Sequence, residues 1–219
     1  MIHTLDDYIC RSIDPSMSFS TNPNLTKKVG IDGEFIPFIG NTVVYDLDNE
    51  VKDSLIKLQN ELYTYGCDVL SQRLEPSTFH MTLHDLFNGQ PEDDKIREKM
   101  VQVAPAVQNI LSQWKYHVPI TMKATWMFNM VNTSIVLGLK PADSDSFFRL
   151  DEMYCRLEEI VPLGYPLCPH ITLAYFRPGQ YLPKQIEGLC RSLRAVQLEL
   201  TLKAENLMLQ NFRHMNCYY

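Results

Sequence analysis

His80-Met81-Thr82-Leu83 occurs a second time in the chain as His170-Ile171-Thr172-Leu173. The two copies lie 90 positions apart and share the pattern His-x-Thr-Leu. Side chains two residues apart on a β-strand point to the same face, so each copy is expected to present an imidazole beside a hydroxyl. Two copies in one cleft would supply two histidines and two hydroxyls, which are the groups that acid–base chemistry on a phosphate ester requires.

The repeat extends beyond these motifs. Asn41-Thr42 precedes the first motif by 39 residues, and Asn132-Thr133 precedes the second by 38. In each half an apolar strand, a helix and the motif strand follow in that order, and then a further helix and an alternating strand. We therefore predict an α+β fold in which two αβ repeats face each other across a pseudo-two-fold axis, with antiparallel sheets lining a central cleft.

Hydrophobic spacing and turn residues define the expected elements. Residues 1–33 form an N-terminal extension, in which 4–13 are expected to be a short helix and 14–32 irregular chain. Residues 34–219 form a single bilobal domain with halves at about 34–125 and 126–219. Expected helices cover 49–65, 91–114, 144–160 and 183–193; expected strands cover 38–47, 69–74, 79–86, 117–123, 133–139, 170–176 and 196–203, with a last strand or hairpin in 207–218.

The net charge of −6 excludes a protein that binds nucleic acid through overall basic charge, and no DNA partner is expected. The charge is unevenly distributed, however. Residues 160–203, which include the second motif, carry five basic and two acidic side chains. This local excess suits an anionic substrate bound at one site, although solvated helix faces give the same pattern.

The six cysteines show no Cys-x-x-Cys spacing, so neither a zinc knuckle nor a thioredoxin-type site is indicated. The first residues lack the basic start and apolar run of a signal peptide, and no apolar stretch approaches the roughly 20 residues needed to cross a bilayer. We expect a cytoplasmic monomer with free thiols and no membrane partner.

Two histidines in one cleft can divide the proton transfers of phosphodiester chemistry. One of His80 and His170 would deprotonate the attacking oxygen and the other would protonate the leaving oxygen. Thr82 and Thr172 would donate hydrogen bonds to the non-bridging oxygens, which hold the negative charge of the transition state. These four residues are the predicted catalytic set, and the scheme requires no metal and no other cofactor.

Two neighbours of the motifs are candidates for binding substrate. His84 lies four positions after His80, so on a regular strand it would share that face and contact substrate or tune the catalytic ring. Its position near a strand end is also one where an exposed histidine costs nothing. Arg177 follows the second motif strand, where it would reach a phosphate or serve only as a surface charge.

Further candidates lie on other strands. Trp126 and Phe128 share one face of their strand and would form a base-stacking platform, although aromatic pairs of this kind also pack in cores. Asn41 would position backbone or substrate. Tyr175 would face away from the second motif into the core, and Cys168 would be buried rather than nucleophilic.

A metal site is the competing interpretation of one spacing. The pair formed by His80 and His84 would be half of such a site if the segment were helical. No third ligand has a recognisable spacing, so no metal site is predicted.

The paired motifs resemble the signature of the 2H phosphoesterase superfamily, which includes the bacterial and archaeal RNA 2′,3′-cyclic phosphodiesterases long called 2′-5′ RNA ligases. Residues Phe38-Ile39-Gly40-Asn41-Thr42-Val43 together with Ser77-Thr78-Phe79-His80-Met81-Thr82 are similar to an uncharacterised bacterial branch of it. The resemblance covers the chain from about Glu34 onward. It implies the bilobal αβ fold, metal-independent chemistry, and catalytic roles for the two histidines and two threonines; the extension lies outside it.

The sequence therefore predicts a cyclic phosphodiesterase-type hydrolase. Its substrate would be a nucleotide or an RNA end, carrying a 2′,3′-cyclic phosphate or a related phosphodiester. Three alternatives stay open: RNA 2′-5′ end joining or cleavage, including action on ADP-ribose cyclic phosphate; a nucleotide- or RNA-binding module without turnover; and a structural two-lobed protein without an anion site.

Overall fold

The computed structural model describes residues 13–115 and 117–219. The helices in these ranges are α2 (Asn49–Gly66), α3 (Asp94–Trp114), α4 (Ser144–Glu158) and α5 (Pro183–Ser192). The strands are β1 (Phe19–Ser20), β2 (Ile39–Asp46), β3 (His80–Gly89), β4 (Ile120–Met130), β5 (Ser134–Pro141), β6 (His170–Tyr175), β7 (Gln180–Tyr181), β8 (Glu199–Leu202), β9 (Leu207–His214) and β10 (Cys217–Tyr218). The expected helix beginning at residue 4 lies outside the described residues.

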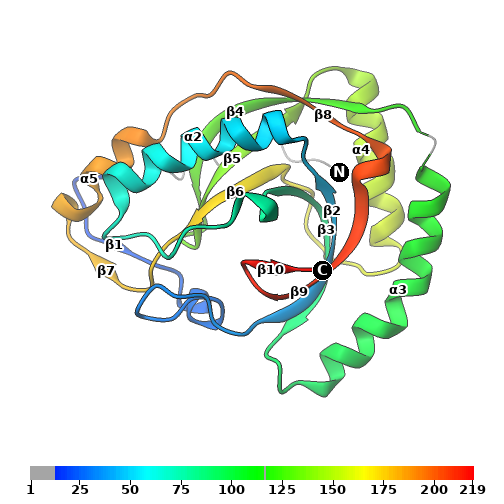
Figure 1. Cartoon of the computed structure of the whole chain (residues 1–219), viewed down its shortest axis with the longest axis horizontal. Coiled ribbons are helices and arrows are strands. Elements are labelled where there is room, and N and C mark those ends of the chain that lie inside the picture. The colour runs from blue at the N-terminus through cyan, green and yellow to red at the C-terminus, as the bar shows by residue number, and fades with distance from the viewer. Residues whose placement is uncertain (1–12, 116) are drawn as a thin grey trace.

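Eight of these strands form one curled antiparallel sheet in the order β10-β9-β2-β3-β6-β5-β4-β8 (Figure 1). The two motif strands, β3 and β6, are its central neighbours, and they pair at Met81 and Ile171. On either side of this pair the order is mirrored: β2 and β9 flank β3, while β5 and β4 flank β6. The predicted α+β architecture with two related halves is confirmed, and the halves meet in a continuous sheet.

Each half of the sheet is completed by a strand from the other part of the sequence. β9, near the end of the chain, pairs with β2, and β4 pairs with β5 and β8. Strands far apart in the sequence therefore lie on both sides of the central pair. This arrangement links the two halves, because β9 lies beside β2 and β4 continues from the first half of the chain into the second.

The helices lie as two pairs, α2 with α5 and α3 with α4, on opposite sides in Figure 1. Helix α2 buries Leu55 and Leu62 completely, as its apolar spacing predicts. Burial of a leucine side chain stabilises a fold by about 1.5–3 kcal/mol. The amide of Gln59 in the same helix donates to the carbonyls of Leu74 and Leu173 at 3.0 and 3.1 Å, which ties α2 to the end of β6.

Two of the differences from the predicted elements have clear reasons. Helix α3 begins at Asp94 rather than residue 91, because the Asp93 side chain accepts a hydrogen bond from the Lys95 amide at 3.1 Å and caps the helix. The strand expected at 69–74 is wrong. This segment forms a single bridge, from Leu70 to Phe176. The backbone amide of Ser71 then donates to the Tyr175 carbonyl, and that of Gln72 donates to the Gly33 carbonyl, so no regular ladder continues.

The stretch predicted to be irregular, 14–32, contains regular structure. β1 pairs with β7, and a 3₁₀ helix covers Pro23–Lys27, capped by the Asn22 side chain. Leu25 and Val29 are fully buried in the main core. This part of the N-terminal extension is therefore packed into the domain.

Two simpler expectations concern the thiols and the membrane. The cysteines at the described positions 67, 168, 190 and 217 are free, as predicted. Among the described helices, none combines the length and the apolar character that a bilayer span would need.

Candidate active site

The four motif side chains meet on one face of the sheet. Because Met81 pairs with Ile171 in antiparallel register, His80 lies opposite Thr172, and Thr82 lies opposite His170. Met81 and Ile171 are completely buried on the other face. The histidines are thus diagonal neighbours, a relation that places residues about 7–8 Å apart in a regular ladder.

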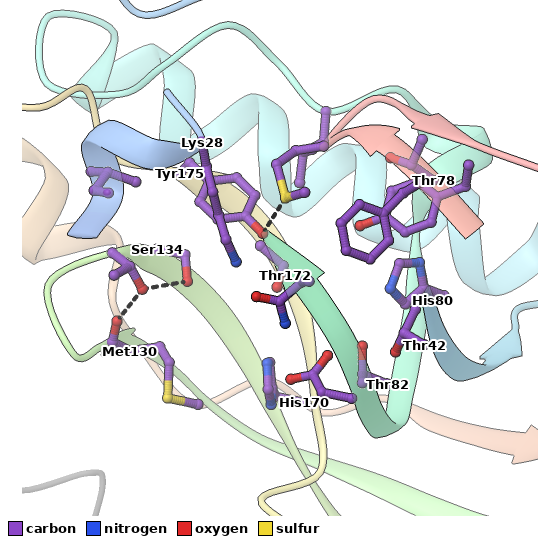
Figure 2. A pocket seen from close by; sticks show the side chains of 18 of the residues that line it. Lys28, Thr42, Thr78, His80, Thr82, Met130, Ser134, His170, Thr172 and Tyr175 are labelled. Carbon is purple, nitrogen blue, oxygen red and sulfur yellow. Dashed lines mark hydrogen bonds between the residues drawn. The ribbon is translucent and has the colours of Figure 1, made fainter. Parts of the chain in front are cut away.

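These side chains lie in a cavity of about 280 Å³. Figure 2 shows both histidines and both threonines directed into it from β3 and β6. The cavity is further lined by Asn24, Leu25, Lys28, Thr42, Leu74, Thr78, Asp85, Asn88, Met130, Thr133, Ser134, Tyr175, Phe212, Met215 and Tyr218. Its size is near the lower end of the range for small-molecule sites. The two motifs lie side by side on its floor, on adjacent strands of one sheet.

Both motif strands carry a β-bulge at the same place. In β3, Thr82 pairs with Val44 and His84 with Val43, so Leu83 is the extra residue. In β6, Thr172 pairs with Val136 and Ala174 with Ile135, so Leu173 is the extra residue. The leucine that ends each His-x-Thr-Leu motif is therefore the bulged residue, and it reverses the facing of the side chains directly after it.

The bulge overturns the prediction for His84. Instead of sharing the face of His80, the His84 ring is buried behind the sheet, with 1% of its surface exposed. Its Nε2 lies 3.0 Å from Oε1 of Glu158 in α4. Burial lowers the pKa of His84, with the Glu158 carboxylate acting in the opposite direction, and the pair fastens α4 to β3.

The same reversal brings in two residues that strict alternation placed elsewhere. Asp85, which the sequence did not single out, lies in the cavity. Tyr175, predicted to face the core, lines it as well, and its hydroxyl donates to Sδ of Met215 at 3.2 Å. Both follow their motif histidine by five positions, so they occupy equivalent places in the two halves with different chemistry.

Backbone carbonyls orient both histidine rings. Nδ1 of His170 lies 2.7 Å from the carbonyl oxygen of Cys168, two residues earlier. The ring of His80 is hydrogen-bonded to the backbone of Thr78, which is also two residues earlier. A proton held on Nδ1 by a carbonyl leaves Nε2 of a neutral ring as the atom that accepts a proton. The second motif thus presents its Nε2 for chemistry.

The cavity favours neutral histidines. Burial lowers the pKa of His80 to about 4, although the Thr78 carbonyl acts in the opposite direction; the His170 charge lowers it further and Asp85 raises it. Burial also lowers the pKa of His170, against the Cys168 carbonyl and Asp85. A bound anion would reverse the effect, because negative charge beside an imidazole favours its protonated form.

Two predicted binding residues have structural positions instead. Nε of Arg177 donates to the Ile31 carbonyl at 2.8 Å, so the side chain holds the N-terminal segment and lies outside the cavity. Asn41 is 1% exposed. Its amide accepts from the Phe87 backbone at 3.1 Å and donates to the Met100 carbonyl at 3.4 Å, because its neighbour Thr42 takes the cavity face of β2.

The predicted stacking platform of Trp126 and Phe128 is wrong. Phe128 is 1% exposed and packs against Val136, while Trp126 is 37% exposed at a bridge to Ala195. Neither lines the cavity. An irregularity between Ala124 and Met127 interrupts β4 at this point, so spacing along the strand does not give the facing.

Besides Tyr175, two aromatic rings that line the cavity come from the C-terminal hairpin. Phe212 of β9 and Tyr218 of β10 lie 5.4 Å apart between ring centroids. The Tyr218 ring meets His80 edge to face, with centroids 4.9 Å apart. The sequence predicts a strand or hairpin in 207–218. It does not predict that this hairpin lies beside the cavity, because that position depends on the pairing of β9 with β2.

The described residues contain no group of three or more histidine, cysteine, aspartate or glutamate side chains placed to hold a metal ion. The competing interpretation of His80 and His84 as half of such a site is incompatible with the fold, because the bulge directs these rings to opposite faces of the sheet.

No family model matches the sequence, and no curated protein does. Solved structures do resemble the fold. A conserved protein of unknown function from Agrobacterium tumefaciens, ATU0111, is 16% identical with a TM-score of 0.64, and the alignment covers 91% of each chain. LigT of E. coli complexed with 3′-AMP is 12% identical with a TM-score of 0.52, covering 83% of this chain and 94% of LigT.

A structure described as a phosphoesterase is also similar. It is 12% identical with a TM-score of 0.51, and the alignment covers 81% of this chain and 88% of that one. At such identities the likeness establishes the fold alone. That fold is the one shared by LigT and the structure described as a phosphoesterase.

Proposed function

We propose that this chain is a phosphoesterase that hydrolyses 2′,3′-cyclic phosphates or related nucleotide and RNA phosphodiesters by two-histidine acid–base catalysis. The observation that carries the proposal is the convergence of His80, Thr82, His170 and Thr172 on one cavity floor. Two imidazoles on a diagonal leave room for a phosphate between an attacking and a leaving oxygen. The likeness in fold to LigT, which has been seen with 3′-AMP, agrees with a nucleotide-sized ligand.

The proposed reaction adds one water across a phosphorus–oxygen bond. One histidine takes a proton from water as its oxygen attacks phosphorus. The bond from phosphorus to one ribose oxygen breaks, and the other histidine donates a proton to that oxygen. Thr82 and Thr172 donate hydrogen bonds to the non-bridging oxygens, where charge accumulates in the transition state. The product is a phosphomonoester with a free neighbouring hydroxyl.

The deciding experiment is turnover of 2′,3′-cyclic mononucleotides and of a short RNA ending in a cyclic phosphate, with EDTA present. We expect release of a phosphomonoester from at least one of them, since the proposed chemistry uses only side chains. Joining of RNA ends instead of hydrolysis would redirect the proposal to a 2′-5′ ligase. Tight binding without any product would indicate a nucleotide-binding module, and neither binding nor product would leave only a structural role.

The pH dependence of turnover follows from the lowered histidine pKa values. Productive free enzyme holds one neutral and one protonated histidine, a state most populated between the two pKa values. Both lie below the ordinary 6.5, so we expect kcat/KM to peak below pH 6.5 and to fall as pH rises. Bound phosphate raises both pKa values, so the profile of kcat should peak at higher pH than that of kcat/KM. A kcat/KM maximum above pH 7 would contradict this assignment.

A further inference from the structure

The N-terminal segment places a lysine inside the cavity. Lys28 follows the 3₁₀ helix, and Figure 2 shows its side chain entering the cavity from the side opposite His170. Its Nζ lies 5.0 Å from the centre of the Phe38 ring. The four motif residues are uncharged when their histidines are neutral. The Lys28 amine therefore supplies a positive charge that the motif residues lack.

The backbone around Lys28 is fixed on both sides. Leu25 and Val29 are fully buried, and Val29 forms an antiparallel bridge to Phe35. The Ile36 amide donates to the Lys28 carbonyl at 3.1 Å, and the Lys28 amide donates to that of Leu25 at 2.9 Å. The ammonium group is consequently carried by a rigid hairpin and its position does not depend on a loose loop.

Lys28 has no carboxylate within 4.0 Å in the described part of the chain, although other lysines there do. Burial lowers its pKa, and the charge of Asp85 acts in the opposite direction at longer range. A partly buried ammonium without an ion-pair partner is costly. An anion entering the cavity removes that cost, so the part of the cavity beside Lys28 is suited to a phosphoryl oxygen.

We infer that Lys28 is a substrate-binding residue that contacts a non-bridging oxygen of the phosphoryl group held over the two motifs. This inference rests on the proposed function and extends it to a residue outside the motif pattern. It makes the N-terminal segment one wall of the site. The ligand class that Lys28 would bind is a phosphate ester, and the interaction depends on the negative charge of its phosphoryl group.

Calorimetric titration with inorganic phosphate, 3′-AMP and uncharged adenosine tests the inference. Lys28→Met keeps the length of the side chain and removes its charge. We expect it to weaken binding of phosphate and 3′-AMP by about 10- to 100-fold, as loss of a charge-assisted hydrogen bond does. Binding of adenosine should not change. Lys28→Arg should retain most of the affinity for the two anions.

Lys27→Met is the matched control, because Lys27 is the preceding residue and its side chain is exposed. It should bind both anions as wild type does, since exposed single charges contribute little. If Lys28→Met has a lowered melting temperature, Lys28→Arg and Lys28→Gln are compared instead. The measurement is then the rise in melting temperature that phosphate produces in each. Equal anion binding by wild type and the charge-removing variants would overturn the inference, as would failure of wild type to bind either anion.

Turnover separates this inference from the proposed function. Where wild type hydrolyses a cyclic nucleotide, Lys28→Met should raise KM more than it lowers kcat, because the contact exists before the transition state. Hydrolysis with unchanged KM and unchanged anion binding would refute Lys28 alone. Binding of phosphate that depends on Lys28 without any hydrolysis would refute the proposed function and leave the anion site.

Discussion

His80→Gln and His170→Gln are each expected to lower kcat by about 10²- to 10⁴-fold, the usual contribution of a general acid or base. Glutamine retains a polar side chain of similar reach but cannot exchange a proton near neutral pH. If the two rings act in the same reaction step, as proposed, the double variant should be little slower than the slower single variant. Initial rates on the best cyclic nucleotide, measured in EDTA, give the comparison.

His117→Gln is the control for the histidine variants. His117 is exposed, stacks on Trp114 at 3.8 Å between ring centroids, and does not line the cavity. It should keep wild-type turnover and 3′-AMP binding. Wild-type turnover by either motif variant, with its melting temperature unchanged, would remove the two-histidine mechanism.

Thr82→Val and Thr172→Val form the second large prediction. Each replaces a hydroxyl with a methyl group of the same shape on a strand that favours β-branched residues. If the hydroxyls stabilise the transition state, each substitution should lower kcat by about 10²- to 10³-fold, the effect of removing one oxyanion donor. KM should change less than kcat, because the interaction strengthens as charge develops on the phosphoryl oxygens.

Serine at the same positions supplies the discriminating variant. Thr82→Ser and Thr172→Ser keep the hydroxyl and lose only the methyl group, so most of the activity should remain. Wild-type activity in the valine variants would show that the hydroxyls are not used. A loss in the serine variants beside wild-type activity in the valine variants would instead point to packing of the methyl group against the floor of the cavity.

The fold class could be predicted from the sequence because the same pattern of strand, helix and motif strand occurs twice. The helices α2, α4 and α5 follow the apolar spacing closely, and both motif strands were recognised by their shared pattern. A repeated motif also implies a shared site, so the meeting of His80 and His170 was predictable. Their register was not, since pairing between distant strands depends on the whole sheet.

Misplaced residues fall into two physical classes. His84 and Tyr175 were assigned to the wrong face because a bulge adds one residue, and period-two reasoning has no means of detecting it. The strand pairing shows that both bulges fall on the leucine of the motif; the sequence alone does not reveal this. Lys28 and Tyr218 were missed because tertiary contacts of the N-terminal segment and C-terminal hairpin bring them to the cavity.

The residues that follow the two bulges give the site a direction. A floor made only of two identical motifs would look the same after a half-turn, and a diester could lie across it either way with equal ease. Asp85 at one end and Tyr175 at the other remove that equivalence, since a carboxylate and a phenol favour different neighbours. Duplication thus supplies two equivalent sets of side chains, and under the proposed function the unequal fifth position would favour one orientation of the diester over the other.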